Sequence, residues 1–168
     1  MDDAKTLFKL ANTQYKKSLE YYVLDGYVTE HVNTKQGMCA LYKALSRLEM
    51  NTERRILMHE RRVEMIEYLK GQLNPNAYQV RMMEFGADLA DSYGDLYEIE
   101  ISKDKKSMQR INDIASKCIE NANLFTGIVY GKEDKEDKFE YVIPMLNNEL
   151  SVASKLTKWI TADGQERI

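Results

Sequence analysis

The sequence predicts an all-helical fold, a tetratricopeptide-like helical repeat (α-solenoid) of about six long antiparallel helices. The 168 residues contain only two prolines and eight glycines. Helix-favouring Glu, Lys, Leu, Met and Ala fill long stretches in which apolar residues recur with the helical period. Small and aromatic residues also return in a fixed order along the chain, which is typical of stacked helix pairs.

Three helices are expected in the first part of the chain, at about 2–24, 27–49 and 51–72. The first is expected to end where Gly26 can take the left-handed conformation of a helix C-cap. Asn51 or Thr52 supplies the N-cap of the third helix. That helix stops before Pro75, because the residue that precedes a proline avoids the helical conformation.

Three further helices are expected at about 75–101, 104–129 and 142–161. Pro75 opens the fourth, because proline is favoured at the first helical position, and Pro144 lies at the start of the sixth. The segment 131–138 has no apolar residue and is predicted to be a charged surface loop. Residues 1–168 are expected to form a single helical-repeat domain.

A degenerate repeat favours a stacked array over a closed bundle. Tetratricopeptide helices of the first type carry a large apolar residue, a small residue and, three further on, an aromatic, so that neighbouring helices approach closely. The matching sites are Met38-Cys39-x-x-Tyr42, Leu89-Ala90-x-x-Tyr93 and Val152-Ala153-x-x-Leu156, and second-type sites are Ala4, Phe8, Ala11 and Ala115, Ile119, Ala122. Coincidence is the alternative, and the third helix lacks the small residues. The helix types alternate so that the chain begins and ends in mid-repeat, as expected of a piece of a longer protein.

Composition argues against several classes of function. The net charge of -3 gives no reason to expect nucleic acid. No apolar run approaches the roughly 20 residues that cross a bilayer, so we expect no membrane span and a cytoplasmic protein. Cys39 and Cys118 lie within helical apolar patterns and are expected to be buried thiols.

Catalytic chemistry is not expected either. His31 and His59 lack the spacing of a zinc site, and neither has a Glu three residues before it, as a di-iron bundle would require. Packed histidines are the expectation. The chain has no glycine-rich phosphate loop and no nucleophile motif. We therefore expect a non-enzyme with no catalytic residue, no metal, no cofactor and no small-molecule substrate.

An acidic stripe on the fourth helix is the first candidate for partner binding. Glu84, Asp88, Asp91 and Asp95 follow one another at spacings of 4, 3 and 4, and no Lys or Arg occurs between Met82 and Ser102. Local ion pairs are therefore not expected to neutralise the stripe, and like charges one turn apart are mutually destabilising. In the repeat register Glu84, Asp91 and Asp95 line the inner groove, and Asp88 lies beside them. They are expected to face a basic partner, with pairing to a neighbouring helix as the alternative.

Four arginines on the third helix are the second candidate. Arg54, Arg55, Arg61 and Arg62 recur at a spacing of seven, which places 54 near 61 and 55 near 62. Their functional interpretation is an anchor for an acidic partner. Because glutamates are interleaved with them, ion pairs on and between helices are the alternative.

Three stretches resemble the C-terminal region of the KIF-binding protein family, the regulators of kinesin motors. They are Leu19-Glu-Tyr-Tyr-Val-Leu-Asp-Gly-Tyr-Val-Thr-Glu-His31, then Glu53-Arg-Arg-Ile-Leu-Met-His-Glu-Arg-Arg62 with Leu73-Asn-Pro75, and Lys155-Leu-Thr-Lys-Trp-Ile-Thr-Ala-Asp163. The segments 132–138 and 164–168 match less well. The resemblance implies a protein that binds kinesin motor domains, keeps them off microtubules, is cytoskeleton-associated and has no catalytic site.

Two other functions stay open. The chain could be a structural segment that docks onto the rest of its own protein, with binding done elsewhere. It could also be a general tetratricopeptide-type scaffold that grips an acidic peptide, although that function needs a basic groove and the fourth helix is acidic.

Overall fold

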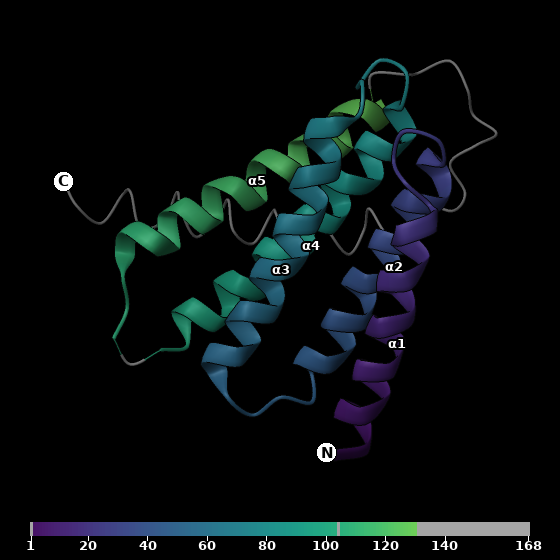
Figure 1. The fold of residues 1–168 in the computed structure, drawn as a ribbon. Coiled ribbons are helices and arrows are strands. Elements are labelled where there is room, and N and C mark those ends of the chain that lie inside the picture. The colour runs from purple at the N-terminus through teal and green to yellow at the C-terminus, as the bar shows by residue number, and fades with distance from the viewer. Residues whose placement is uncertain (1, 104, 131–168) are drawn as a thin grey trace. The chain divides into compact units, whose positions relative to one another are not determined.

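The computed structural model describes residues 2–103 and 105–130 (Figure 1). These residues form five α-helices and no strand: α1 Asp2–Tyr21, α2 Val28–Ser46, α3 Thr52–Gln72, α4 Gln79–Ile101 and α5 Met108–Tyr130. The all-helical prediction is confirmed for this part of the chain. The count of six helices is not reached, because the sixth, expected at about 142–161, lies outside the described residues, as does the predicted loop 131–138. The solenoid arrangement stays a prediction.

The chain divides into two compact units, Met1–Gln72 and Leu73–Ile168. In the first, α1 packs on α2 and α2 packs on α3 (Figure 1). The rings of Phe8 and Tyr42 meet edge to face with centroids 5.0 Å apart, so residues of the predicted repeat join α1 to α2. Between α2 and α3, the thiol of Cys39 lies 3.8 Å from the carbonyl oxygen of Arg62. Cys39 is buried and free, as its position in the apolar pattern predicts.

Helix α1 ends earlier than expected, and not through a glycine cap. Its last residue is Tyr21, and no glycine in the described residues has a positive φ, so the predicted left-handed cap at Gly26 is wrong. The carbonyl of Tyr22 instead accepts a hydrogen bond of 2.7 Å from Nδ1 of His31. The amide of Tyr27 donates to the carbonyl of Val23 at 3.0 Å. These bonds fix the α1–α2 connection just after the helix, and the carbonyls of Ser18 and Tyr21 at the helix end accept from the amides of Tyr22 and Val23, so no left-handed residue is needed.

The start of α3 follows the prediction. The amide of Arg54 donates to Oδ1 of Asn51 at 2.9 Å, which makes Asn51, rather than Thr52, the N-cap. Glu49, whose side chain is 5% exposed, accepts a 3.0 Å hydrogen bond from the amide of Asn51. Its carboxylate also lies 3.8 Å from Nζ of Lys5, so this residue connects α1 to the turn before α3.

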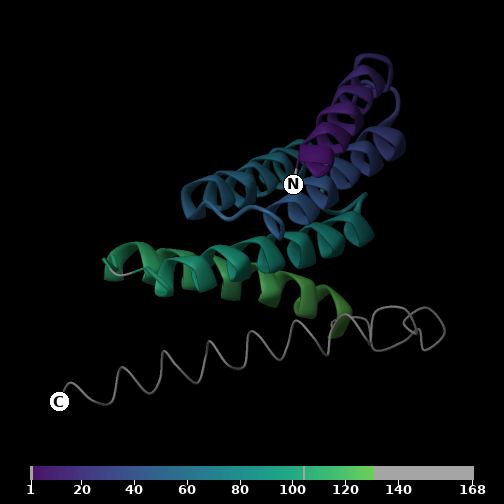
Figure 2. The ribbon, with the colours of Figure 1, turned by 90° about the horizontal axis from the view of Figure 1, so that it is seen from below.

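In the second unit, α4 and α5 lie side by side and antiparallel (Figures 1 and 2). Near the middle of the pair, the thiol of Cys118 donates to the carbonyl of Ala90 at 3.3 Å. One turn away, a Cβ placed on Gly86 would lie 3.0 Å from the backbone oxygen of Asn121 and 3.1 Å from the backbone nitrogen of Phe125. The small residues Gly86 and Ala90 therefore allow the close approach, as the repeat pattern predicts for Ala90.

Helix α4 begins at Gln79, four residues after Pro75, so Pro75 does not open the helix as expected. The carbonyl of Asn74 accepts hydrogen bonds from the amides of Ala77 and Tyr78, at 3.1 and 3.0 Å. Its side-chain oxygen accepts a further bond of 2.9 Å from the amide of Asn76. Asn74 thereby closes a separate turn around Pro75 before the helix starts.

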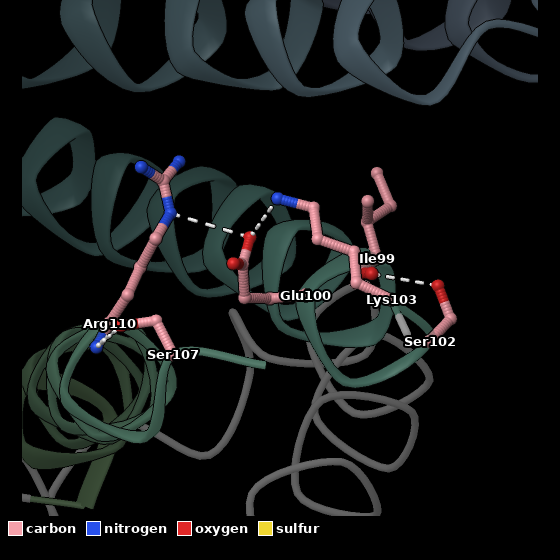
Figure 3. A network of polar contacts seen from close by, with 6 residues as sticks. All are labelled: Ile99, Glu100, Ser102, Lys103, Ser107 and Arg110. Carbon is pink, nitrogen blue, oxygen red and sulfur yellow. Dashed lines mark hydrogen bonds and ion pairs between the residues drawn. The ribbon is translucent and has the colours of Figure 1, made fainter. Parts of the chain in front are cut away.

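A buried carboxylate holds the α4–α5 connection (Figure 3). Oε2 of Glu100, whose side chain is 5% exposed, lies 2.7 Å from Nζ of Lys103 and 3.4 Å from Nε of Arg110. Arg110 belongs to the first turn of α5, and its amide lies 3.4 Å from the hydroxyl of Ser107. The Arg110 pair ties the last turn of α4 to the first turn of α5, and the Lys103 pair fixes the start of the connection.

Candidate partner-binding surface

The acidic stripe runs along α4 in the second unit. Its four residues are half-buried: Glu84, Asp88, Asp91 and Asp95. Glu98, which lies beyond the stripe, is exposed. Most of the remaining residues in the middle of the helix are buried, and Leu89, Tyr93 and Leu96 are among them. The stripe is therefore the polar part of a helix that is otherwise covered, and α4 carries six carboxylates against one arginine.

The expectation that no local ion pair neutralises the stripe is wrong at Glu84. Nη1 of Arg81 lies 2.7 Å from Oε2 of Glu84, one turn earlier on the same helix. The stretch without basic residues begins at Met82, so the nearest arginine lies just outside it. Asp88, Asp91 and Asp95 also have interaction partners. The like-charge repulsion that the sequence suggested is therefore reduced at Glu84.

The four candidate arginines lie on α3 in the first unit, and they divide into two kinds. Arg54 and Arg61 are exposed, with side chains 62% and 66% accessible. Arg61 forms a 3.0 Å ion pair with Glu64, and Arg54 lies 3.7 Å from Glu49. The Arg61–Glu64 pair is exposed on both sides, and pairs of this kind contribute about 0–1 kcal/mol, so Arg61 could exchange its partner for another carboxylate with little loss of stability. The partner of Arg54 is the buried Glu49, so only the guanidinium side of that pair is exposed.

Arg62 and Arg55 are placed differently. Arg62 is buried, and its Nη1 lies 2.9 Å from Nδ1 of His59, which is also buried. Because arginine can only donate, Nδ1 accepts and the ring proton of His59 is on Nε2. Arg55 is half-buried. Each of them follows an exposed arginine by one residue, which is about 100° around the helix, and this rotation places Arg62 on the packed side, where an incoming partner cannot reach it while the unit stays folded.

One sequence signal could have found this burial. His59, Arg62, Ile66 and Leu69 follow one another at spacings of 3, 4 and 3, and all four are buried. A stripe with two aliphatic members places the arginine on the packing face. The expectation that both histidines are packed is confirmed by His59 and by His31, which is 9% exposed.

A cluster of three tyrosines at the α1–α2 connection did not emerge from the sequence. The rings of Tyr21, Tyr22 and Tyr27 lie with centroids 5.1 to 5.6 Å apart. The residues were visible in the sequence as part of the stretch from Leu19 to His31. Their contact depends on the turn that brings Tyr27 back to the end of α1.

The described helices contain neither a candidate metal site nor a candidate membrane span. No group of three or more His, Cys, Asp and Glu in the described part of the chain could hold a metal ion. Among the same residues, no helix is both long enough and apolar enough to pass through a membrane. The described chain is thus an all-helical protein whose most distinctive surface features are charged and aromatic side chains.

Comparison with known proteins assigns the family. A family model described as "KIF-1 binding protein C terminal" matches residues 1–168, so the chain belongs to this family. The KIF-binding proteins of Gallus gallus and Homo sapiens are 27% and 28% identical to it, over 99% of this chain in both cases. A KIF-binding protein of Dictyostelium discoideum is 27% identical over 73% of the chain.

The chain corresponds to only part of these relatives. It spans 30% of the Gallus gallus protein, 28% of the Homo sapiens protein and 20% of the Dictyostelium discoideum protein. No solved structure matches the chain significantly.

Proposed function

We propose that the chain is a non-catalytic helical-repeat segment that binds kinesin motor domains and inhibits their attachment to microtubules. The observation that carries this proposal is the match of the whole chain, residues 1–168, to the family named for binding of a kinesin. The place of action would be the cytoplasm, at the microtubule cytoskeleton.

The acidic stripe on α4 is the surface that we propose for the motor. A motor face that attaches to acidic tubulin must itself be basic, and complementary charge speeds and orients association. The stripe offers Glu84, Asp88, Asp91 and Asp95 on one side of a helix whose other sides are covered. Half-buried carboxylates have lost part of their hydration already, so a partner has less water to remove from them.

The first experiment measures capture and competition together. The 168-residue chain is immobilised and presented with a panel of purified kinesin motor domains. The same chain is then titrated into motor domains bound to microtubules in a sedimentation assay. We expect capture of at least one motor and its release from the microtubule pellet. Capture without release would retain binding and reject inhibition.

The second experiment tests the stripe by charge reversal. Asp91→Lys with Asp95→Lys is compared with Asp113→Lys and Glu120→Lys, which change the net charge equally at exposed positions of α5. We expect the α4 pair to weaken motor binding by about tenfold at low salt and to flatten its salt dependence. Equal effects of the two pairs would show that the stripe is not the contact.

A second candidate function is docking onto another segment of the same protein. The observation in its favour is the exposed apolar side of α1, where Leu7 and Leu10 are 65% and 59% accessible. Exposed leucines one turn apart are suited to covering by protein. This function predicts that the chain alone captures no motor domain, and that Leu7→Ser with Leu10→Ser disrupts the longer protein without affecting a motor contact.

A further inference from the structure

The tyrosine cluster, defined as Tyr21, Tyr22 and Tyr27, forms a compact aromatic surface at the connection between α1 and α2. Tyr21 and Tyr22 meet edge to face at 5.1 Å, and Tyr22 and Tyr27 do the same at 5.6 Å. Tyr21 and Tyr27 are tilted by 34° at 5.4 Å. At these separations the rings contact one another, so a ligand has no room between them and must lie on their outward faces.

The outward faces are accessible. Tyr21 is 66% exposed and Tyr27 is 39% exposed, and Val23 between them is 50% exposed. Tyrosine is favoured in protein interfaces because it offers a large contact area with only two side-chain torsions to fix. The cluster therefore has the exposure and the residue type of a contact surface.

The backbone beneath the cluster is fixed by hydrogen bonds. The amide of His31 donates to the carbonyl of Tyr27 at 2.8 Å, and its ring donates to the carbonyl of Tyr22 at 2.7 Å. His31 itself is buried. The pKa of the Tyr27 phenol is raised, first by its hydrogen bond with Tyr21 and less by desolvation and nearby negative charge, so the ring stays neutral. A preformed surface reduces the entropy that a partner loses on binding.

Exposed negative charge flanks the tyrosines, and no ion pair among the described residues neutralises it. Glu20, Asp25 and Glu30 are exposed, and no Lys or Arg occurs from Ser18 to Thr34. Within the described residues, none of the three carboxylates takes part in an ion pair. Elsewhere in the same unit, Nζ of Lys35 lies 5.9 Å from the ring centroid of Tyr68, so a cation already covers that ring. The tyrosine cluster has acidic surroundings, and in the part of the chain that the structure describes no Lys or Arg lies over its rings.

We propose that the tyrosine cluster, with its three flanking carboxylates, is a docking surface for Lys and Arg side chains of a partner protein. The ring faces attract the cation and cover its aliphatic stem, while the carboxylates orient the charge. The identification of this partner as a kinesin motor domain rests on the proposed function. The surface lies in the unit Met1–Gln72, whereas the acidic stripe of α4 lies in the other unit. Each can therefore be altered without changing the other.

The experiment separates the aromatic face from simple apolar area. Tyr21→Leu with Tyr27→Leu keeps apolar side chains but removes the rings, and Tyr21→Phe with Tyr27→Phe keeps the rings. The control is Tyr68→Leu, because Tyr68 is 51% exposed on α3 of the same unit. We expect the double Leu variant to weaken binding of a captured motor domain by about 3- to 30-fold, with the Phe variant and the control within about twofold of the parent.

Three outcomes would overturn the proposal. They are equal binding by the double Leu variant and the control, equal weakening by the Leu and Phe variants, and a change in self-association of the chain with no change in motor binding. Sedimentation velocity of each variant measures the self-association. If the unaltered chain captures no motor, the proposed function fails and the surface is tested separately.

That separate test uses a synthetic arginine-glycine peptide and NMR of the tyrosine ring protons. We expect the resonances of Tyr21 and Tyr27 to shift several times more than that of Tyr68, and the shifts to disappear when Glu20, Asp25 and Glu30 are replaced by Gln. Equal shifts at all three rings would reject the docking surface, whether or not the chain binds kinesin.

Discussion

In both units a cysteine thiol and a glycine lie where two helices pack together, but the helices of the second unit approach each other more closely. In the second unit, the Cys118 thiol lies 3.3 Å from a backbone carbonyl of the facing helix, and Gly86 faces backbone atoms of α5. In the first, the Cys39 thiol is 3.8 Å from its carbonyl, and Gly37 faces only the end of the Tyr15 side chain. Helix α4 buries eleven residues, whereas no residue of α1 from Asp3 onward is fully buried.

This difference indicates that the two units present different kinds of surface to other proteins. The α4–α5 pair buries most of the large apolar residues that the structure describes in it, with Val80 and Met108 at its helix ends 62% and 49% exposed, and its main surface feature is the charged stripe. The first unit leaves Leu7, Leu10 and the tyrosine cluster accessible, with Tyr21 as much as 66% exposed. Surfaces that are left apolar by the packing of a unit are the ones available to another protein.

The largest expected effect on stability comes from replacing one phenylalanine in each unit by alanine. Phe125 is 3% exposed and packs against Ala87 and Met83, whereas Phe8 is half-buried against Tyr42. We expect Phe125→Ala to lower the free energy of unfolding of the α4–α5 pair by about 3–5 kcal/mol. Phe8→Ala should lower that of the first unit by about 1–2 kcal/mol. Amide hydrogen exchange, measured separately in the two units, reports both values. Equal losses would remove the distinction between them.

The buried carboxylate gives the next effect. Glu100→Gln leaves Lys103 and Arg110 without their shared anion, and we expect the α4–α5 pair to lose about 1–3 kcal/mol of stability. The loss is moderated because the two cationic side chains are 30% and 44% exposed. Urea denaturation checks this value. Glu98→Gln, an exposed neighbour on the same helix, serves as the control and should change the stability little.

Two glycine substitutions compare the closeness of packing directly. A Cβ on Gly86 would meet backbone atoms of α5 at 3.0 and 3.1 Å, whereas a Cβ on Gly37 would meet the Tyr15 hydroxyl at 2.8 Å. A side-chain end can move aside and a helix backbone cannot. We expect Gly86→Ala to lower stability by about 1 kcal/mol, because crowding exceeds the gain in helix propensity. Gly37→Ala should raise stability slightly in thermal denaturation. A loss for both would show equally tight packing in the two units.

The smallest effect concerns pH. The pKa of Glu49 is lowered, first by the hydrogen bond from the Asn51 amide and then by Lys5 and Arg54. A carboxylate with a lowered pKa contributes stability above its unfolded-state pKa, and this contribution is lost as the pH falls through the folded-state value. We expect Glu49→Gln to lower the thermal midpoint near neutral pH, with the difference shrinking as the pH falls below about 4. A difference that stays constant over that range would exclude the linkage.

The positions of the helices could be predicted from the sequence, but the end of α1 and the start of α4 could not. The interiors of α1 to α5 follow from the apolar period, since burial of one face stabilises a helix over its whole length. The ends depend on single side chains. His31 holds the carbonyl of Tyr22 across nine residues, and Asn74 closes the turn at Pro75 through both its carbonyl and its side chain. Contacts of this kind compete with glycine and proline signals and leave no periodic trace.

The candidate site could be predicted in part for a related reason. Helical spacing aligns the carboxylates of α4 and the arginine pairs of α3, because residues three and four apart share a face. It does not show which face the rest of the protein covers. Arg61 and Arg62 are neighbours in sequence, yet one is 66% exposed in its side chain and the other is buried against His59. The tyrosine cluster needs the α1–α2 turn itself, which the sequence placed at a glycine.

The two buried thiols have a practical consequence. Each unit contains one free cysteine, Cys39 or Cys118, and both are closed to solvent. An alkylating reagent can react with such a thiol only after its unit has opened. The two cysteines of the sequence can therefore report the rate at which each unit opens, without any substitution. A slower reaction at one cysteine in the presence of a partner would identify the unit that the partner holds closed.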